Sequence, residues 1–398
     1  MGLRSIKEIF ITGHGPSSSH TMGPYFACQY ILKKYKDIKS IEVTLYESLA
    51  LTGKGHLTDY IIDKALKDIK HQIIFDTKTR TKHPNTMSFK IVTKDKDYVE
   101  NVISIGGGSI VTVDNLQELD KDDVYPHQHM TEIMKYCQEN DISFYDYITK
   151  FEGDVYDYFK NVLKVMDEAY HRGLVAEGVL PGKLHVKRKA KAMHDAMEET
   201  ERAEEDVAMN VAIASFAVAE ENAAGGIIVT APTCGSAGVI PGCIKYLRMK
   251  GVSDDNIIKG LAVAGLFGIV CKVNASVSGA ECGCQAEIGV ACSMGAAMIA
   301  FCFGKDIVDI VQSAEIALEH SLGLTCDPVD GYVQIPCIER CAIYAIKAIN
   351  AVKLAIVIPN DDIHVSYDDS IRTMYKTGLD MNEKYKETSL GGLAEFIK

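Results

Sequence analysis

The chain has 398 residues, enough for two domains that each have a hydrophobic core of their own. Its composition, 47% hydrophobic and 24% charged, is typical of a soluble globular protein. A net charge of −12 and the lack of a long basic stripe argue against a nucleic-acid partner. No signal peptide precedes the chain's first strand, and the twelve cysteines form no short disulfide framework, so we expect a cytoplasmic protein with reduced thiols.

The first 115 residues alternate between strand and helix patterns. β-branched alternation predicts strands at 6–13, 38–49, 71–78, 87–94 and 97–111. Helical periodicity lies between them at 24–36 and 57–69. Three consecutive glycines at 106–108 predict a turn between two strand pieces. The segment 1–150 is therefore predicted to be an α/β domain in which helices cover one sheet.

The rest of the chain is predicted to be helical, which makes the fold class α+β. A connector at 151–190 contains a helix over 154–173 that Gly173 should end, and an all-helical domain follows at 191–398. Its helices are predicted at 191–223, 237–250, 253–273, 284–303, 305–322, 335–356 and 366–378. The apolar runs 257–273 and 288–304 are rich in small residues and hydrophobic all round, so they are interpreted as central helices, with no membrane partner.

Two polar loops are candidate sites for a small carboxylate. The first supplies hydroxyl and imidazole groups between a strand and a helix, and its residues are Ser17, Ser18, Ser19, His20 and Thr21. The second precedes a helix and contains Asn274, Ser276 and Ser278. The alternative for both loops is simple helix capping, which also favours serine and threonine.

Histidines offer two further hypotheses. His56 lies just before a predicted helix, and an imidazole suits proton transfer near neutral pH, although a cap or core histidine is the alternative. His127 and His129 could bind zinc, but no third ligand lies nearby, which favours a surface loop.

Three cysteines at predicted junctions between loops and helices are candidate metal ligands. Cys284, Cys326 and Cys337 would each face a helix N-terminus, which stabilises a thiolate. Three thiolates can hold an iron–sulfur cluster and leave one iron without a protein ligand. The alternative is that all are ordinary buried thiols. Cys234 and Cys282 lie in other loops and are interpreted as small residues.

Together these stretches resemble the bacterial iron–sulfur-dependent L-serine dehydratases, also called L-serine ammonia-lyases. The similarity runs in order through GPSSSHTMGP, LTGKGHLTD, SIGGGSIV, EGVLPG, EENAAGG, NASVSGAE, GCQAEIGVACSM, GLTCDPV, VQIPCIER and YKETSLGGLA. The resemblance is to the single-chain form, with a β-type domain before an α-type domain. It implies that the β-type domain is similar to the regulatory substrate-binding domain of phosphoglycerate dehydrogenases.

The resemblance also implies the chemistry. A [4Fe-4S] cluster would be held by Cys284, Cys326 and Cys337, and His56 would be the base in a β-elimination that converts L-serine to pyruvate and ammonia. The chain departs from the family pattern at His14, Glu47, Cys234, Asp330 and Cys341, which leaves the substrate open. A cysteine desulfidase or a threonine dehydratase on the same scaffold, a non-catalytic iron–sulfur sensor, and a zinc or cluster-free protein are the alternatives. We also expect a homodimer.

Overall fold

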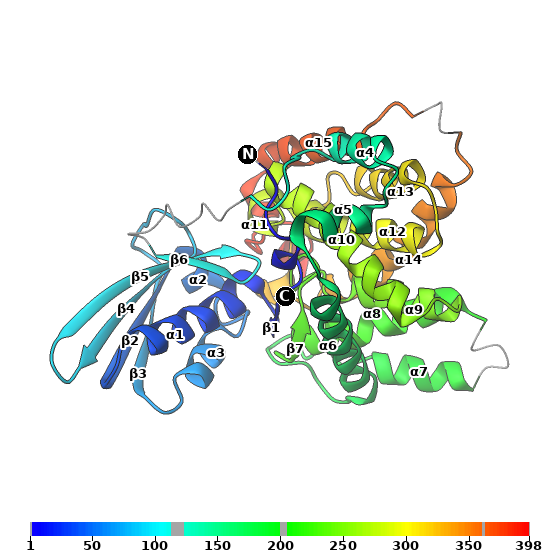
Figure 1. Cartoon of the computed structure of the whole chain (residues 1–398). Helices are drawn as coiled ribbons and strands as arrows, with labels where there is room; N and C mark the ends of the chain where they lie inside the picture. The colour runs from blue at the N-terminus through cyan, green and yellow to red at the C-terminus, as the bar shows by residue number, and fades with distance from the viewer. Residues whose placement is uncertain (1, 113–122, 200–204, 360–362, 398) are drawn as a thin grey trace.

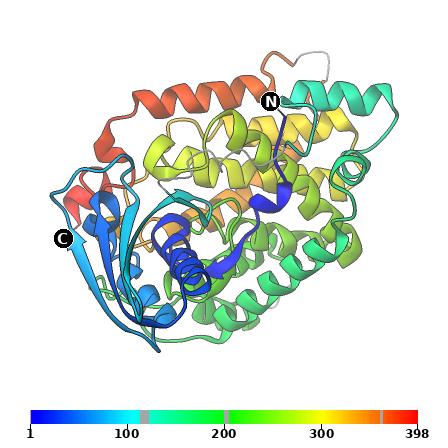
Figure 2. The same ribbon diagram turned by 60° about the vertical axis from the view of Figure 1, so that its left-hand side comes forward.

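The computed structural model describes residues 2–112, 123–199, 205–359 and 363–397. Figure 1 shows a sheet with its helices on one side of the molecule and a larger helical body on the other. The predicted α+β class is confirmed, with the sheet region first in the chain. The end of the chain returns to the boundary between the two parts, as the views in Figures 1 and 2 agree.

The sheet has five strands in the order β3-β2-β4-β5-β6, with β2 and β3 parallel and the other pairs antiparallel. The strands are β2 (Ile38–Tyr46), β3 (Lys70–Asp76), β4 (Thr86–Thr93), β5 (Asp97–Gly106) and β6 (Ser109–Thr112). The helices of this part are α1 (Gly23–Lys34), α2 (Glu47–Thr52) and α3 (Thr58–Ala65). Alternate apolar side chains of β2 and β4 pack in one core with these helices, because successive side chains of a strand point to opposite faces. The predicted turn at 106–108 is confirmed, since it joins β5 to β6.

The prediction of a strand over 6–13 is only partly right. Residues Ile6–Glu8 form a 3-10 turn, and only β1 (Thr12–His14) is extended. Ile6, Ile9 and Phe10 are fully buried in the core of the helical body. Their spacing of three and four residues is helical, which explains the turn. Strand β1 pairs with β7 (Ile227–Val229), so the start of the chain is tied to the helical body.

The helical body is built around long apolar helices. Its helices are α4 (Met130–Glu139), α5 (Phe144–Glu152), α6 (Tyr156–Val175), α7 (Ala190–Glu198), α8 (Val207–Ala223), α9 (Val239–Met249), α10 (Asp254–Asn274), α11 (Gly279–Cys282), α12 (Val290–Cys302), α13 (Ile307–Glu319), α14 (Cys337–Ala355), α15 (Tyr367–Asp380) and α16 (Leu393–Phe396). Side chains of α4 and α5 belong to this core, whereas the sheet core draws on side chains between Tyr25 and Ile110. The domain bounds at 150 and 190 stay a prediction.

Two helix predictions are corrected by the structure. The single helix predicted over 191–223 is two helices, α7 and α8, and the break includes residues 200–204, which lie outside the described part. Gly173 does not end α6, which continues to Val175. A Cβ atom at Gly173 would lie 2.0 Å from the carbonyl oxygen of Ala217 on α8. This glycine therefore allows two helices to approach closely.

Within the described residues, two helices are long and apolar enough to cross a membrane, namely Asp254–Asn274 and Gln285–Cys302. Their most apolar windows are 78% and 89% buried inside the protein. Burial of this extent is expected for the central helices of a core, as the sequence predicted.

We expect Gly173→Ala to destabilise the protein although alanine is the better helix former. The clash with α8 should cost about 1–3 kcal/mol, which exceeds the gain of about 1 kcal/mol in helix propensity. Urea unfolding measures the free energy of unfolding. Glu168→Ala on the same helix, at an exposed side chain, is the control and should change stability by less than about 0.5 kcal/mol. A Gly173→Ala variant as stable as wild type would contradict this account of the helix packing.

Candidate active site

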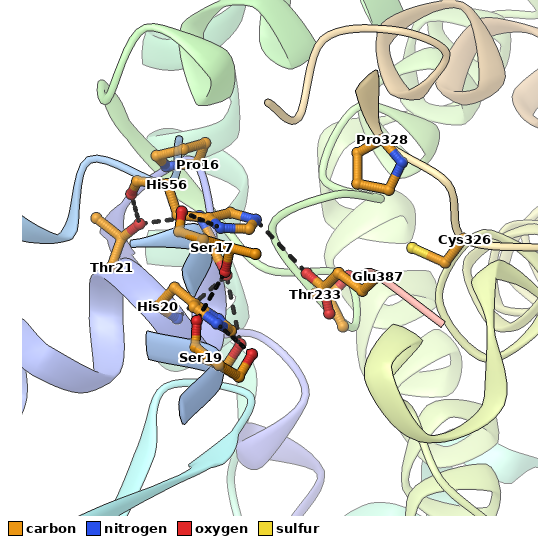
Figure 3. Close-up of polar contacts among 12 residues, drawn as sticks. Pro16, Ser17, Ser19, His20, Thr21, His56, Thr233, Cys326, Pro328 and Glu387 are labelled. Atoms are coloured by element: carbon orange, nitrogen blue, oxygen red, sulfur yellow. Dashed lines mark hydrogen bonds and ion pairs between the residues drawn. The ribbon is translucent and has the colours of Figure 1, made fainter. Parts of the chain in front are cut away.

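A cavity of about 650 Å³ lies where the sheet part meets the helical body. The sheet part contributes the loop after β1 and the turn between β5 and β6, and the helical body contributes the segment after α10 and three cysteines. Figure 3 shows the two sides facing each other, with Ser17 and His56 on one side and Thr233, Cys326 and Glu387 on the other. The groups named from sequence motifs far apart in the chain therefore meet around one cavity.

The three predicted cysteine ligands all line this cavity. Cys284 directly precedes the π-helical turn Gln285–Gly289 that leads into α12, and Cys337 is the first residue of α14. Cys326 lies in a loop and is held by main-chain hydrogen bonds to Tyr385 and Glu387 (2.8 and 2.7 Å). Of the twelve cysteines, all of which are described and free, these three line the cavity.

The thiols influence one another's ionisation. A hydrogen bond from Cys326 lowers the pKa of Cys284, and the charge of Arg340 lowers it further against the effect of burial. The same contact, together with burial, raises the pKa of Cys326. Burial and the charge of Cys284 raise the pKa of Cys337. In the free protein Cys284 is therefore the thiol whose ionisation is favoured over that of Cys326 and Cys337.

Three sulfur donors around one cavity are consistent with an iron–sulfur cofactor. Within the described ranges, no three side chains of His, Cys, Asp or Glu are placed to hold one ion. A cluster distributes its thiolate ligands over different irons, so its cysteines surround a cavity rather than converge on a point. Sulfur donors at 284, 326 and 337 also match the soft ligands that iron–sulfur clusters require.

His127 and His129, the histidines considered for zinc, have other contacts. His127 hydrogen-bonds through Nδ1 to the Tyr147 hydroxyl (3.0 Å), and His129 caps α4.

The serine loop is a compact hydrogen-bonded turn, Ser18–Met22, capped by Ser17. Ser17, Ser18 and Ser19 line the cavity. His20 lies behind them, with Nδ1 2.8 Å from the Ser19 hydroxyl and Nε2 3.0 Å from the Ser48 hydroxyl. Thr21 Oγ1 donates to the carbonyl oxygen of His56 (2.6 Å), which joins the loop to the base candidate.

His56 is fully buried beneath this loop. Its Nδ1 lies 3.1 Å from the carbonyl oxygen of Thr52, which can only accept, so Nδ1 carries the proton and Nε2 a lone pair. Within the described part of the chain Nε2 has no hydrogen-bond partner, and it faces Glu387 Oε1 at 3.6 Å. Burial lowers the pKa of His56 to about 4, against the raising effect of the Thr52 bond. The imidazole is therefore neutral at pH 7.

In the second polar loop one residue has a structural role and two line the cavity. Asn274 donates to the carbonyl oxygens of Val270 and Gln128 (both 2.9 Å) and closes the end of α10. Ser276 and Ser278 line the cavity. Ser276 Oγ donates to Glu281 Oε2 (2.6 Å), which fixes the conformation of the loop.

Sequence reasoning missed the carboxyl groups that line the cavity, among them those of Glu287 and Glu387. Thr233 donates its hydroxyl hydrogen to Glu287 Oε2. Burial raises the pKa of Glu287, and it raises the pKa of Glu387 to about 8 with help from the charges of Glu287 and Cys284. A usable signal was present for Glu287, an acidic residue within the otherwise apolar start of a core helix.

The departures from the family pattern lie outside the cavity lining. Asp330 has a left-handed backbone (φ 52°) and forms an ion pair with Lys183 (3.0 Å). Cys341 donates to the carbonyl oxygen of Gly235 (3.3 Å). Cys234 packs in a small apolar cluster, and Cys282 packs against Gly378. None of these side chains is placed to touch a molecule in the cavity.

Comparisons with known proteins match the full architecture. Residues 5–70 match the family model described as serine dehydratase beta chain, and residues 61–394 match the one described as serine dehydratase alpha chain. The chain is 39% identical to L-serine dehydratase 2 of Escherichia coli strain K12, with 98% of each chain covered. It is 38% identical to an L-serine dehydratase of Helicobacter pylori strain J99 (99% of each) and 35% identical to one of Streptomyces coelicolor (98% of each).

Burial of neutral His56 should make the protein less stable in mild acid. The pKa of His56 is about 4 in the folded protein and 6.5 ordinarily. Between these values the unfolded chain binds a proton at His56 and the folded chain does not, so acid favours unfolding. Between pH 7 and pH 5 this should remove about 2 kcal/mol of stability. Urea unfolding at both pH values should show that His56→Gln loses about that much less than wild type does.

The control for this experiment is His320→Gln, at a side chain that is 62% exposed. It should retain the wild-type dependence of stability on pH. If His56→Gln also retained that dependence, the imidazole would not be buried in its neutral form.

Proposed function

Because this chain belongs to the serine dehydratase family, we propose that it is a lyase that converts L-serine to pyruvate and ammonia by β-elimination. The observation that carries the proposal is the meeting of the three cysteines and the serine loop around one cavity, with His56 directly behind it. The cysteines would supply a metal centre, the serine loop a site for the carboxylate group, and His56 a base. These are the parts that removal of water from a β-hydroxy amino acid requires.

The thiolates of Cys284, Cys326 and Cys337 would hold a [4Fe-4S] cluster. When bound, such a cluster supplies a Lewis-acid iron that makes the β-hydroxyl group a better leaving group. Three thiolates in a partly buried cavity need compensating charge, and Arg340 provides it, since its guanidinium lies close enough to lower the pKa of Cys284. Arg340 also donates to Thr325 O (2.8 Å) and Asp327 Oδ1 (3.1 Å), which fixes the loop that carries Cys326.

The substrate's carboxylate would be bound by the serine loop. Ser17, Ser18 and Ser19 line the cavity and offer hydroxyl donors, and Ser276 and Ser278 offer further donors from the opposite side. His20 and Thr21 hold the serine loop in place through their own hydrogen bonds. Asn274 fixes the end of α10, from which the opposite loop begins. Binding from both sides would orient the substrate's Cα hydrogen.

His56 would accept the Cα proton at Nε2. The Thr52 carbonyl leaves this nitrogen unprotonated, and burial keeps the imidazole neutral at pH 7. As the proton leaves Cα, the Cβ–O bond breaks and the hydroxyl group departs as hydroxide. The hydroxide and the proton taken up at Nε2 together make the water that is lost. The aminoacrylate product tautomerises to an imine, and water hydrolyses it to pyruvate and ammonia.

The proposal includes a cytoplasmic location and a homodimer. Free thiols at all twelve cysteines are compatible with a reducing compartment. Light scattering of the purified protein measures the mass of the oligomer directly.

Anaerobically purified protein should contain about four irons per chain and release pyruvate from L-serine. Serine substitution of Cys284, Cys326 or Cys337 should lower iron affinity by at least about tenfold, and activity should fall with it. Iron and sulfide assays with lactate dehydrogenase-coupled detection of pyruvate measure both. Air exposure should remove the activity, because an iron without a protein ligand is accessible to oxygen.

Cys341→Ser is the matched control, since Cys341 is buried nearby but does not line the cavity. It should retain iron and activity. Parallel assays with L-cysteine and L-threonine distinguish a desulfidase or a threonine dehydratase. Wild-type protein with a full complement of iron but no turnover of L-serine would overturn the proposal.

His56→Gln should retain the iron content of wild type while kcat falls about 100- to 10,000-fold, the range for loss of a general base. Separate measurement of iron and kcat distinguishes loss of the base from loss of the cofactor. A variant with wild-type kcat would remove His56 from the mechanism.

A further inference from the structure

Two carboxyl groups in the cavity have no role in the reaction as described so far. Glu287 lies in the π-helical turn Gln285–Gly289, and Glu387 follows the 3-10 turn Glu383–Tyr385 near the end of the chain. Both line the cavity beside the cysteines. Burying two like charges close together is costly unless a cation or hydrogen-bond donors compensate for them. The cavity therefore calls for a positively charged occupant near these groups.

The surroundings of Glu287 are shaped to hold its carboxyl group in one place. Thr233 donates to Oε2, and a Cβ atom on Gly235 would lie only 3.2 Å from that oxygen. A Cβ atom on Gly279 would lie 2.0 Å from Oε1, so any other residue there would displace the carboxyl group. Oε1 lies 3.8 Å from the Cys326 thiol. A thiolate ligand cannot donate a hydrogen, so cluster binding by Cys326 would leave Oε1 in need of another donor.

Glu387 is held against the same cavity by its main chain. Its backbone is left-handed (φ 58°), a conformation that is unfavourable for a non-glycine residue and that recurs at functional sites. Its N–H donates to Cys326 O (2.7 Å). Ser389, which is also left-handed, donates to Pro328 O (2.6 Å) and fixes the segment that follows. The carboxyl group is thereby placed 3.6 Å from His56 Nε2, as the dashed line in Figure 3 marks.

We propose that Glu287 and Glu387 together bind the α-ammonium group of the amino-acid substrate, an inference that rests on the proposed function. An ammonium group has three N–H donors and a positive charge, which match two carboxyl groups that form no ion pair with a lysine or arginine among the described residues. Arg340, whose charge lowers the pKa of Glu287 against the effect of burial, does not line the cavity. The two cations that line the cavity, Arg4 and Lys272, both contact a different carboxylate, Glu8 (3.6 and 3.2 Å).

This placement also serves the base. The ammonium nitrogen and the abstracted hydrogen are bonded to the same carbon, so an ammonium group at Glu387 brings Cα next to His56 Nε2. Glu387 lines the cavity whereas His56 is fully buried behind it. The imidazole can reach the substrate only when the Glu387 carboxyl group turns toward another partner. The ammonium group supplies that partner, so binding of the correct substrate uncovers the base.

The specificity that follows is for α-amino acids over acids that lack the amino group. The test compares L-serine with 3-hydroxypropanoate, which has the carboxylate and hydroxyl groups but no ammonium group. In Glu287→Gln and Glu387→Gln, KM and the calorimetric Kd for L-serine should rise about 30-fold or more, as expected when one partner of a buried charge pair is removed. The Kd of 3-hydroxypropanoate should stay the same, because this ligand has no ammonium group for the glutamates to bind.

Glu139→Gln, at an exposed residue of α4, is the control and should match wild type for both ligands. Iron content is measured for every variant, so that loss of the cluster is not mistaken for loss of binding. Equal weakening of both ligands would show that the glutamates only support the fold, and no weakening of L-serine would show that they do not bind it. Either result overturns the inference while the proposed function stands. Wild-type protein that neither binds nor turns over L-serine would overturn both.

Discussion

The structure depends on the burial of several acidic groups around one cavity. The groups that line it include the three thiols and the carboxyl groups of Glu287 and Glu387, and each of these would be unstable there as an isolated charge. Arg340 is the cation that offsets part of this cost, since its charge favours the thiolate of Cys284. Thr233 provides a hydroxyl donor for Glu287. The chain thus surrounds the site with fixed partners, which is why distant segments have to meet there.

The end of the chain links these partners. Segment 383–393 hydrogen-bonds to the Cys326 loop on both sides of the cysteine, and the N–H of Leu393 donates to Asp327 Oδ2 (2.8 Å). Asp327 also accepts from Arg340, so the segment, the loop and the cation form one unit. The sheet part contacts the same loop closely at Gly55. A Cβ atom on this glycine would lie 3.1 Å from the carbonyl oxygen of Asp330. The cavity is therefore complete only when both parts of the molecule are packed together.

Local patterns predicted most of the secondary structure but not what depends on distant contacts. The five strands of the sheet and most helices follow from periodicity, and the motifs named the three cysteines that line one cavity. The early strand prediction was partly wrong because Ile6 and Phe10 pack against helices far along the chain. The roles of Glu287 and Glu387 were missed for the same reason. Glu287 contacts Thr233, which lies 54 positions earlier in the chain. Glu387 faces His56, which belongs to the other part of the molecule.

Exclusion of water has opposite effects on the acids and the base of this site. It raises the pKa of Glu287 and Glu387, and it lowers the pKa of His56. Both effects favour uncharged groups, so the free cavity is biased toward low net charge. A neutral imidazole with its lone pair at Nε2 is also the form that accepts a proton. The burial that makes the cavity costly to build therefore prepares its base in the form that accepts a proton.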